Sequence, residues 1–234
     1  MRLALGVGIL CLWGGSAWAA PTGLNTIPTP DLVPVNQYNV VGQNSNASIA
    51  AHPTVFQRPV LLPQFESGVT DSTEGGVDII PGRTPGHYTA ALNLKWKPVW
   101  ELYDRPAVGI GIIQPVTDFS PTYYLVVTRT INYQQILNQK FRAHHRNIKL
   151  RGRRVHAGIT KTPSGTFPLL GTDIEMSDQF VLYSDWISGS PNALTLGGVY
   201  VINDQNSLTA SLLYGNHQQR INGLLVNYNR TTNW

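Results

Sequence analysis

The densest group of side chains able to do chemistry lies between Arg142 and His156. Its cations are Arg142, Arg146, Lys149, Arg151, Arg153 and Arg154, accompanied by His144, His145 and His156. Such a cluster suits anions: lipopolysaccharide phosphates, an acidic polysaccharide, or the ions that a positive lining selects in a pore. The alternative is a solvated loop or strand extension beyond a membrane. Because aromatic stacking partners are absent from this stretch, nucleic acid is not an expected partner.

Catalytic and metal-binding patterns are not found. The six histidines show no metal-ligand spacing with cysteine or acidic residues, and the neighbouring His144 and His145 would point to opposite faces of a strand. Neither G-x-S-x-G nor a glycine-rich phosphate loop occurs. A hydrolase triad assembled from distant strands stays open, because geometry defines it. We expect no enzyme, no cofactor and no metal, and we interpret Asp185 as a carboxylate that forms hydrogen bonds across a polar interior.

The elements that must position these residues are strands. Of 234 residues, 42% are hydrophobic and only 13% are charged, about half of the usual charged share. The 22 glycines and 16 prolines, with frequent asparagine and threonine, break helical patterns every few residues. The composition predicts an all-β protein that faces something other than plain water.

The N-terminus has the order of a secretory signal peptide. Arg2 precedes an apolar run from Leu3 to Trp13, and Ala17-Trp18-Ala19 forms an A-x-A cleavage pattern. The run is shorter than the roughly 20 residues that a membrane anchor needs. We expect residues 1–19 to be removed after Ala19, which leaves no cysteine, because Cys11 is the only one. Disulfides and thiol chemistry are then excluded.

The next segment, residues 20–63, is rich in proline and asparagine. Seven prolines limit it to one or two edge strands, such as Asn36 to Gln43, and predict an extended periplasmic arm. From Gln64 to Trp234, runs of 8 to 12 residues alternate between large apolar and small or polar residues. Turn clusters such as Asp71-Ser72-Thr73 and Asn203-Asp204-Gln205-Asn206 separate them, as in a meander of antiparallel hairpins.

The alternation is clear in His87 to Lys97. Leu92, Leu94 and Trp96 fall on one face, and Ala91, Asn93 and Lys95 fall on the other. A soluble sandwich or barrel would bury the apolar face, whereas a transmembrane barrel would turn that face to lipid and its small, polar face to the lumen. Alternation alone does not choose between them. Low charge on the polar face and strands near 10 residues long favour the membrane.

The C-terminus is the third feature that favours the membrane. Leu224, Val226, Tyr228, Arg230, Thr232 and Trp234 share one face of the last strand. Tyr228 and the terminal Trp234 resemble the C-terminal assembly signal of bacterial outer-membrane barrels, although Arg230 and Thr232 occupy positions where that pattern prefers apolar residues. An exposed tail that ends in tryptophan is the alternative. The resemblance implies the barrel-assembly machinery as a partner.

Three segments resemble a group of poorly characterised exported bacterial outer-membrane β-barrel proteins. They are Pro28-Thr29-Pro30-Asp31-Leu32-Val33-Pro34, the pair formed by 105–111 and 123–127, and Val181-Leu182-Tyr183-Ser184-Asp185. The resemblance implies an arm near the barrel followed by successive barrel strands, and some relatives are linked to exopolysaccharide export. The group has no established catalytic residues.

These observations predict one closed antiparallel up-and-down β-barrel of about 12 strands, with 10 as the alternative. We expect an outer-membrane protein of the bacterial envelope, structural, channel-like or associated with polysaccharide export, with lipid, lipopolysaccharide and anionic polysaccharide as partners. The alternative is a soluble periplasmic or secreted binding module.

Overall fold

The computed structural model describes residues 24, 27–45, 60–81, 88–102, 105–115, 120–131, 152–189, 192–216 and 220–233. The expected signal segment, 1–19, and its cleavage site lie outside these residues. All twelve regular elements of the described part are strands. They are β1 (Gln37–Ser45), β2 (Val60–Thr70), β3 (Thr73–Pro81), β4 (Tyr88–Val99), β5 (Ala107–Pro115), β6 (Thr122–Ile131), β7 (Gly152–Thr162), β8 (Gly165–Glu175), β9 (Phe180–Ile187), β10 (Ala193–Asn203), β11 (Asn206–Gly215) and β12 (Arg220–Asn233).

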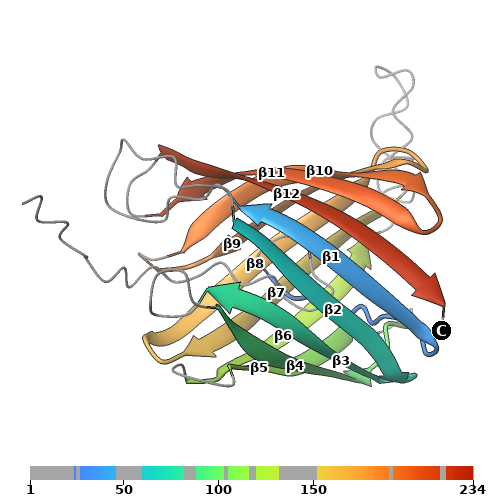
Figure 1. Ribbon diagram of the computed structural model, residues 1–234, viewed down its shortest axis with the longest axis horizontal. Coiled ribbons are helices and arrows are strands. Elements are labelled where there is room, and N and C mark those ends of the chain that lie inside the picture. The colour runs from blue at the N-terminus through green and yellow to red at the C-terminus, as the bar shows by residue number, and fades with distance from the viewer. Residues whose placement is uncertain are drawn as a thin grey trace, which may run out of the picture.

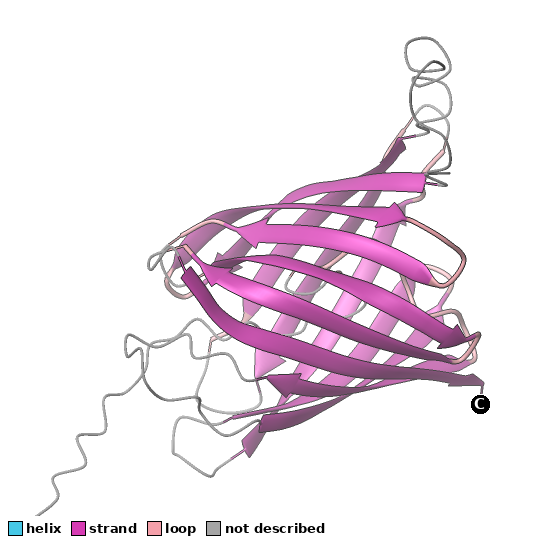
Figure 2. Ribbon diagram, turned by 90° about the horizontal axis from the view of Figure 1, so that it is seen from above, coloured by secondary structure: helices cyan, strands magenta, loops and turns pink. Residues whose placement is uncertain are grey.

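The strands form one closed barrel. Each pairs antiparallel with the next along the chain, and β1 pairs with β12 from Gln37 opposite Asn233 to Ser45 opposite Leu225. The ring of strands is seen in Figure 1, and Figure 2 shows their common tilt. This confirms the predicted all-β, up-and-down barrel of 12 strands. Among the described residues, no helix is long and apolar enough to cross a bilayer.

Short polar turns join several strands at the positions that the sequence predicted. In the β10–β11 turn, the Gln205 amide donates to Asn203 Oδ1 at 3.0 Å, which replaces a backbone hydrogen bond. In the β2–β3 turn, the Ser72 amide donates to Thr70 Oγ1 at 3.3 Å. Asparagine and threonine close these hairpins because their short side chains accept from the amide two residues on.

The two faces of each strand differ in kind. On β4, Leu92, Leu94 and Trp96 are exposed on the outside, whereas Asn93 and Lys95 are buried on the inside. The same division holds on β11, where Leu208 and Leu212 point outward while Thr209 and Ser211 are buried. The barrel is therefore apolar outside and polar inside, the reverse of a soluble domain. The expected low charge of the inner face is wrong, because Glu66, Glu74, Asp78, Lys95, Asp173 and Asp185 are all buried there.

The N-terminal region departs from the expected arm in two ways. The barrel begins at β1, so the expected boundary at residue 64 falls inside β2, where Pro63 takes an exposed position. Residues 27–35, which we call the plug segment, contact the inner wall rather than extending away from it. The prolines explain both departures. Several prolines suit an extended segment that forms no ladder of strand hydrogen bonds, as in residues 27–35. A single proline is tolerated within a strand, as at Pro63, where no backbone N–H is needed for pairing.

Candidate functional site

The plug segment fills part of the barrel interior, the lumen. Ile27, Thr29 and Val33 are almost completely buried, and the segment contacts β2, β3, β5, β7 and β8. In Figure 1 it is the blue trace within the ring of strands. Because one short segment touches strands on opposite parts of the ring, it crosses the lumen.

Glycines on the wall let the plug segment approach closely. A Cβ on Gly68 of β2 would lie 2.3 Å from the carbonyl oxygens of Val33 and Pro34, and one on Gly109 of β5 would lie 3.1 Å from the Cα of Pro30. On β8, a Cβ at Gly171 would lie 2.4 Å from Ile27 Cδ1. Only a residue without a side chain permits this contact between plug and wall.

A buried ion pair on β3 and β4 holds the main chain of the plug segment. Lys95 Nζ lies 3.2 Å from Glu74 Oε1, and both side chains are completely buried. The other carboxylate oxygen, Glu74 Oε2, accepts a 2.6 Å hydrogen bond from the Val33 amide. This acceptor recognises the backbone, so the contact does not depend on which side chain stands at Val33.

A second ionic network, on β7 and β8, holds a side chain of the plug segment. Arg154 donates through Nη2 to Asp173 Oδ2 at 2.7 Å and through Nε to Asp173 Oδ1 at 3.1 Å. Its Nη1 donates to Asp31 Oδ2 at 2.7 Å, and Thr29 Oγ1 donates to the same oxygen at 3.0 Å. The guanidinium therefore bridges a wall carboxylate and a plug carboxylate in the geometry that suits it best.

The electrostatics of Asp31 follow from that bridge. Burial opposes ionisation of its carboxyl group, but the Arg154 charge and the hydrogen bonds from Arg154 and Thr29 outweigh burial and hold the pKa of Asp31 below its ordinary value. Asp31 is therefore a carboxylate near neutral pH, and in that form it stabilises the contact between the plug segment and the wall.

A hydroxyl, an imidazole and a carboxylate form a chain behind Arg154. Thr128 Oγ1 lies 2.7 Å from His156 Nδ1, and His156 Nε2 lies 3.2 Å from Asp173 Oδ2. These three groups also make up hydrolase triads, but here Thr128 and His156 are buried in the wall and Asp173 also binds Arg154. The chain fixes the orientation of Asp173 toward the guanidinium.

An apolar contact anchors the start of the plug segment. Ile27 packs with the buried Val126 of β6 and Leu169 of β8, and the partly buried Leu24 and Ile187 pack against this cluster. The plug is thus held by apolar contact at one end and by polar contacts around Asp31 and Val33.

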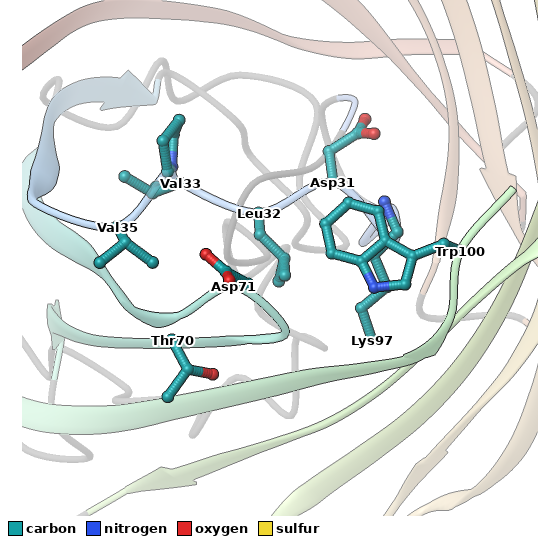
Figure 3. Close-up of a pocket in the computed structure, with 9 residues that line it drawn as sticks. Asp31, Leu32, Val33, Val35, Thr70, Asp71, Lys97 and Trp100 are labelled. Atoms are coloured by element: carbon teal, nitrogen blue, oxygen red, sulfur yellow. The ribbon is translucent and has the colours of Figure 1, made fainter.

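A cavity of about 390 Å³ lies between the plug segment and one end of the barrel. Figure 3 shows Asp31, Leu32 and Val33 on its plug side and Asp71, Lys97 and Trp100 on its wall side. Lys97 Nζ lies 4.2 Å from the centroid of the Trp100 ring, a cation–π contact. The plug segment therefore leaves a space against the wall at this end of the barrel.

The residues predicted to bind anions are placed as follows. Arg142, Arg146, Lys149 and Arg151 lie outside the described residues. Arg153 and Arg154 project to opposite faces of β7, as alternation required: Arg153 Nε donates to Thr172 Oγ1 at 3.3 Å, whereas Arg154 is engaged by two carboxylates in the lumen. His156, counted with the same basic segment, belongs to the buried network.

Of the two residues predicted to form the assembly signal, one lies in the described part of the chain. Tyr228 is exposed on the outer face of β12, and its hydroxyl donates to Asn206 Oδ1 at 2.5 Å. Trp234 lies outside the described residues. Asp185 is buried and accepts a hydrogen bond from the Thr195 hydroxyl across the β9–β10 pair, which fits its interpretation as an interior carboxylate.

The position of the plug segment and its two ionic contacts with the wall were not predicted from the sequence. For one contact a partial signal existed, since alternation puts Lys95 on the polar face of its strand. Nothing local, however, joins Asp31 to Arg154, which lies 123 residues away. In the described part of the chain, no group of three or more histidine, cysteine, aspartate or glutamate side chains is arranged to hold a metal.

Comparison with known proteins does not assign a family to this chain. No family model matches the chain, and no curated protein matches it.

Proposed function

We propose that this protein is a membrane-spanning barrel of the bacterial outer membrane, and that it is a channel whose lumen is closed by its own plug segment. The observation that carries the proposal is the reversal of polarity across the wall. Large apolar residues such as Leu94, Leu196 and Leu212 are exposed outside, and charged residues such as Glu74 and Lys95 are buried inside. A bilayer stabilises this arrangement because lipid covers the apolar band.

The alternative, a soluble periplasmic or secreted module, fits this polarity poorly. Its core would have to be the inner face, where several charged groups lie and burial of charge is costly. Its surface would carry exposed apolar residues on nearly every strand, far more than isolated surface hydrophobics. The cost of burying charge and the extent of the exposed apolar surface both favour a barrel with lipid outside.

The plug segment supports a channel over a purely structural barrel. A structural barrel can fill its interior with wall side chains alone. Here the wall keeps glycines at positions 68, 109 and 171, and a separate segment occupies the space. A lumen that needs a plug to be closed has room for solute without it.

Cell fractionation tests the location. We expect the full-length protein in the outer-membrane fraction after a carbonate wash, with the heat-modifiable migration typical of folded barrels. Release with the periplasm would contradict the proposal and support the soluble module.

A matched pair of substitutions tests which face meets lipid. Leu94→Lys puts a charge on the outer face near the middle of β4 and should cost about 2–4 kcal/mol of stability in a bilayer. Asp204→Lys places the same residue in the exposed β10–β11 turn and should leave membrane integration unchanged. Equal integration of both variants would argue against a lipid-facing wall.

A further inference from the structure

The inner wall formed by β2, β3, β4 and β6 carries an unusual strip of oxygen-bearing side chains. We propose that this strip makes the lumen selective for cations once the plug segment is displaced. The strip consists of Glu66, Glu74, Asp78, Asn93 and Tyr124, all buried. The inference rests on the proposed channel function and adds the charge class of its solute.

The charge of the described lumen wall is acidic. Its buried acids are Glu66, Glu74, Asp78, Asp173 and Asp185. The cations on the same inner face are the buried Lys95, the partly exposed Arg154 and Lys97. Lys95 and Arg154 each already lie against a wall carboxylate, Glu74 and Asp173 respectively, and Lys97 lies over the Trp100 ring in the cavity at one end of the barrel. Acidic walls concentrate cations and exclude anions, because low-dielectric surroundings focus their field.

Buried polar atoms without a strong protein partner provide the second observation. Both carboxylate oxygens of Asp78, both amide atoms of Asn93 and the Tyr124 hydroxyl lack a well-formed hydrogen bond, although these residues are only 1%, 5% and 4% exposed. Asn93 lies beside Asp78, and the contact between the two is weak. Buried polar groups in proteins are nearly always satisfied. A group of them on one wall indicates a partner from outside the chain, such as a hydrated cation.

Strand register brings these atoms together. Gly76 of β3 lies opposite Glu66 on one side and Asn93 on the other, and Asp78 is the next inward residue of β3. The Tyr124 ring covers Gly111 of β5, where a Cβ would meet its hydroxyl oxygen at 2.2 Å, and Gly111 pairs with Lys95 of β4. The strip is therefore continuous from β2 to β6.

Displacement of the plug leaves this balance in place. The plug segment takes Asp31 away, but Arg154 keeps Asp173 as its partner, and Glu74 keeps Lys95. The described part of the wall therefore retains its excess of acidic residues after the plug leaves. This is opposite in sign to the anion-selecting lining that the basic segment suggested.

The test uses the full-length chain with the plug contacts weakened. Asp31→Arg places a cation against Arg154, and Val33→Pro removes the N–H that donates a hydrogen bond to Glu74. In planar bilayers under a potassium chloride gradient, we expect this double variant to conduct, with K⁺ at least about threefold more permeant than Cl⁻. Equal permeability, a preference for Cl⁻ or no conductance would each overturn the inference.

The strip itself is tested by removing charge without changing shape. Adding Glu66→Gln and Asp78→Asn to the opened variant should bring the K⁺/Cl⁻ permeability ratio toward one. Asp204→Asn, which removes the same charge at the exposed β10–β11 turn, should leave the ratio unchanged. An unchanged K⁺/Cl⁻ permeability ratio in the variant with Glu66→Gln and Asp78→Asn would show that the strip does not determine selectivity.

A second measurement needs no change in the strip. For the opened variant, replacing chloride by gluconate should preserve conductance, and replacing potassium by N-methylglucamine should abolish most of it. The reverse pattern overturns cation selectivity. If the proposed location fails, the protein is absent from the carbonate-washed membrane. If the channel function fails, the opened variant inserts as a heat-modifiable barrel but does not conduct, whereas failure of selectivity alone leaves an inserted barrel that conducts without preferring K⁺.

Discussion

The two polar contacts that fix the plug segment, Glu74 to Val33 and Arg154 to Asp31, differ in which part of the plug they bind. On β3 and β4, Glu74 accepts from the Val33 main chain while Lys95 neutralises it in a fully buried pair. On β7 and β8, Arg154 binds the side chain of Asp31 at a site where both partners are about a third or more exposed. The first is a dry contact to the backbone, and the second is a wetter contact to a side chain.

This difference assigns the two contacts different roles, one in the stability of the barrel and the other in the opening of the plug. A buried ion pair contributes to the barrel itself, because removal of one partner leaves an uncompensated charge in the wall. A partly exposed pair contributes less, and a single proton or a single substitution in the plug breaks it. We therefore expect the Glu74 side to dominate folding and the Arg154 side to tune opening.

The largest effect should come from Lys95→Met. It leaves the Glu74 carboxylate buried without its cation and should lower the free energy of unfolding by about 3–5 kcal/mol. Urea unfolding in lipid vesicles, followed by tryptophan fluorescence, measures it. Lys95→Met with Glu74→Gln keeps an oxygen for the Val33 amide and should recover most of the loss. A loss under about 1 kcal/mol for the single variant would remove the distinction between the two contacts.

Next in size is the displacement of the plug by one added methyl group. In Gly68→Ala the Cβ would meet backbone carbonyl oxygens at 2.3 Å, so the plug main chain must leave, and the open fraction should rise from rare to dominant. In Gly171→Ala the Cβ meets the tips of Ile27 and Leu24 at 2.4 and 2.7 Å, and these flexible ends can rotate away. Single-channel recording compares them, with heat-modifiable migration as the folding check. Equal opening in both variants would contradict this account.

A smaller effect is expected from Asp31→Asn. The substitution removes the charge that Arg154 binds, and solvent screening limits the loss to about 1 kcal/mol, or roughly a fivefold rise in open fraction. Asp71→Asn, the same change at the other side of the cavity, should not alter opening. If the two variants behave alike, net charge in the cavity rather than the Arg154 contact controls the plug.

The barrel could be predicted from the sequence because its causes are local. The two-residue period on β4 and the Asn203–Asn206 turn are each contained within a few residues, so strand faces and a count near 12 follow from them. Alternation also predicts that Arg153 and Arg154 lie on opposite faces of one strand, because they are neighbours in sequence.

The plug could not be predicted because its contacts are long-range. Val33 and Glu74 are 41 residues apart, and Asp31 and Arg154 are 123 apart, so no window along the chain contains both partners. The prolines indicated extended chain but not its direction, since an extended segment inside a barrel and one outside it have the same local pattern. The acidic residues of the inner wall were missed for a related reason: they are scattered over β2, β3, β8 and β9, whereas the cations cluster in sequence.

The smallest effect, and the finest test of the comparison, is the response of the plug to acid. Arg154, with Lys95 and Lys97 nearby, faces Asp31 and holds its pKa below the ordinary value of 3.8. A carboxyl group with a lowered pKa stabilises the docked plug at every pH above 3.8, and this contribution is lost as the pH falls through the lowered pKa. Open fraction in bilayers should therefore stay flat from neutral pH down to 3.8 and rise only below it. Asp31→Asn has no proton to gain, so its open fraction should start higher and lack that rise. A rise at mildly acidic pH in both proteins would mean that a wall carboxylate, rather than Asp31, senses the proton, and would move control of opening to the Glu74 side.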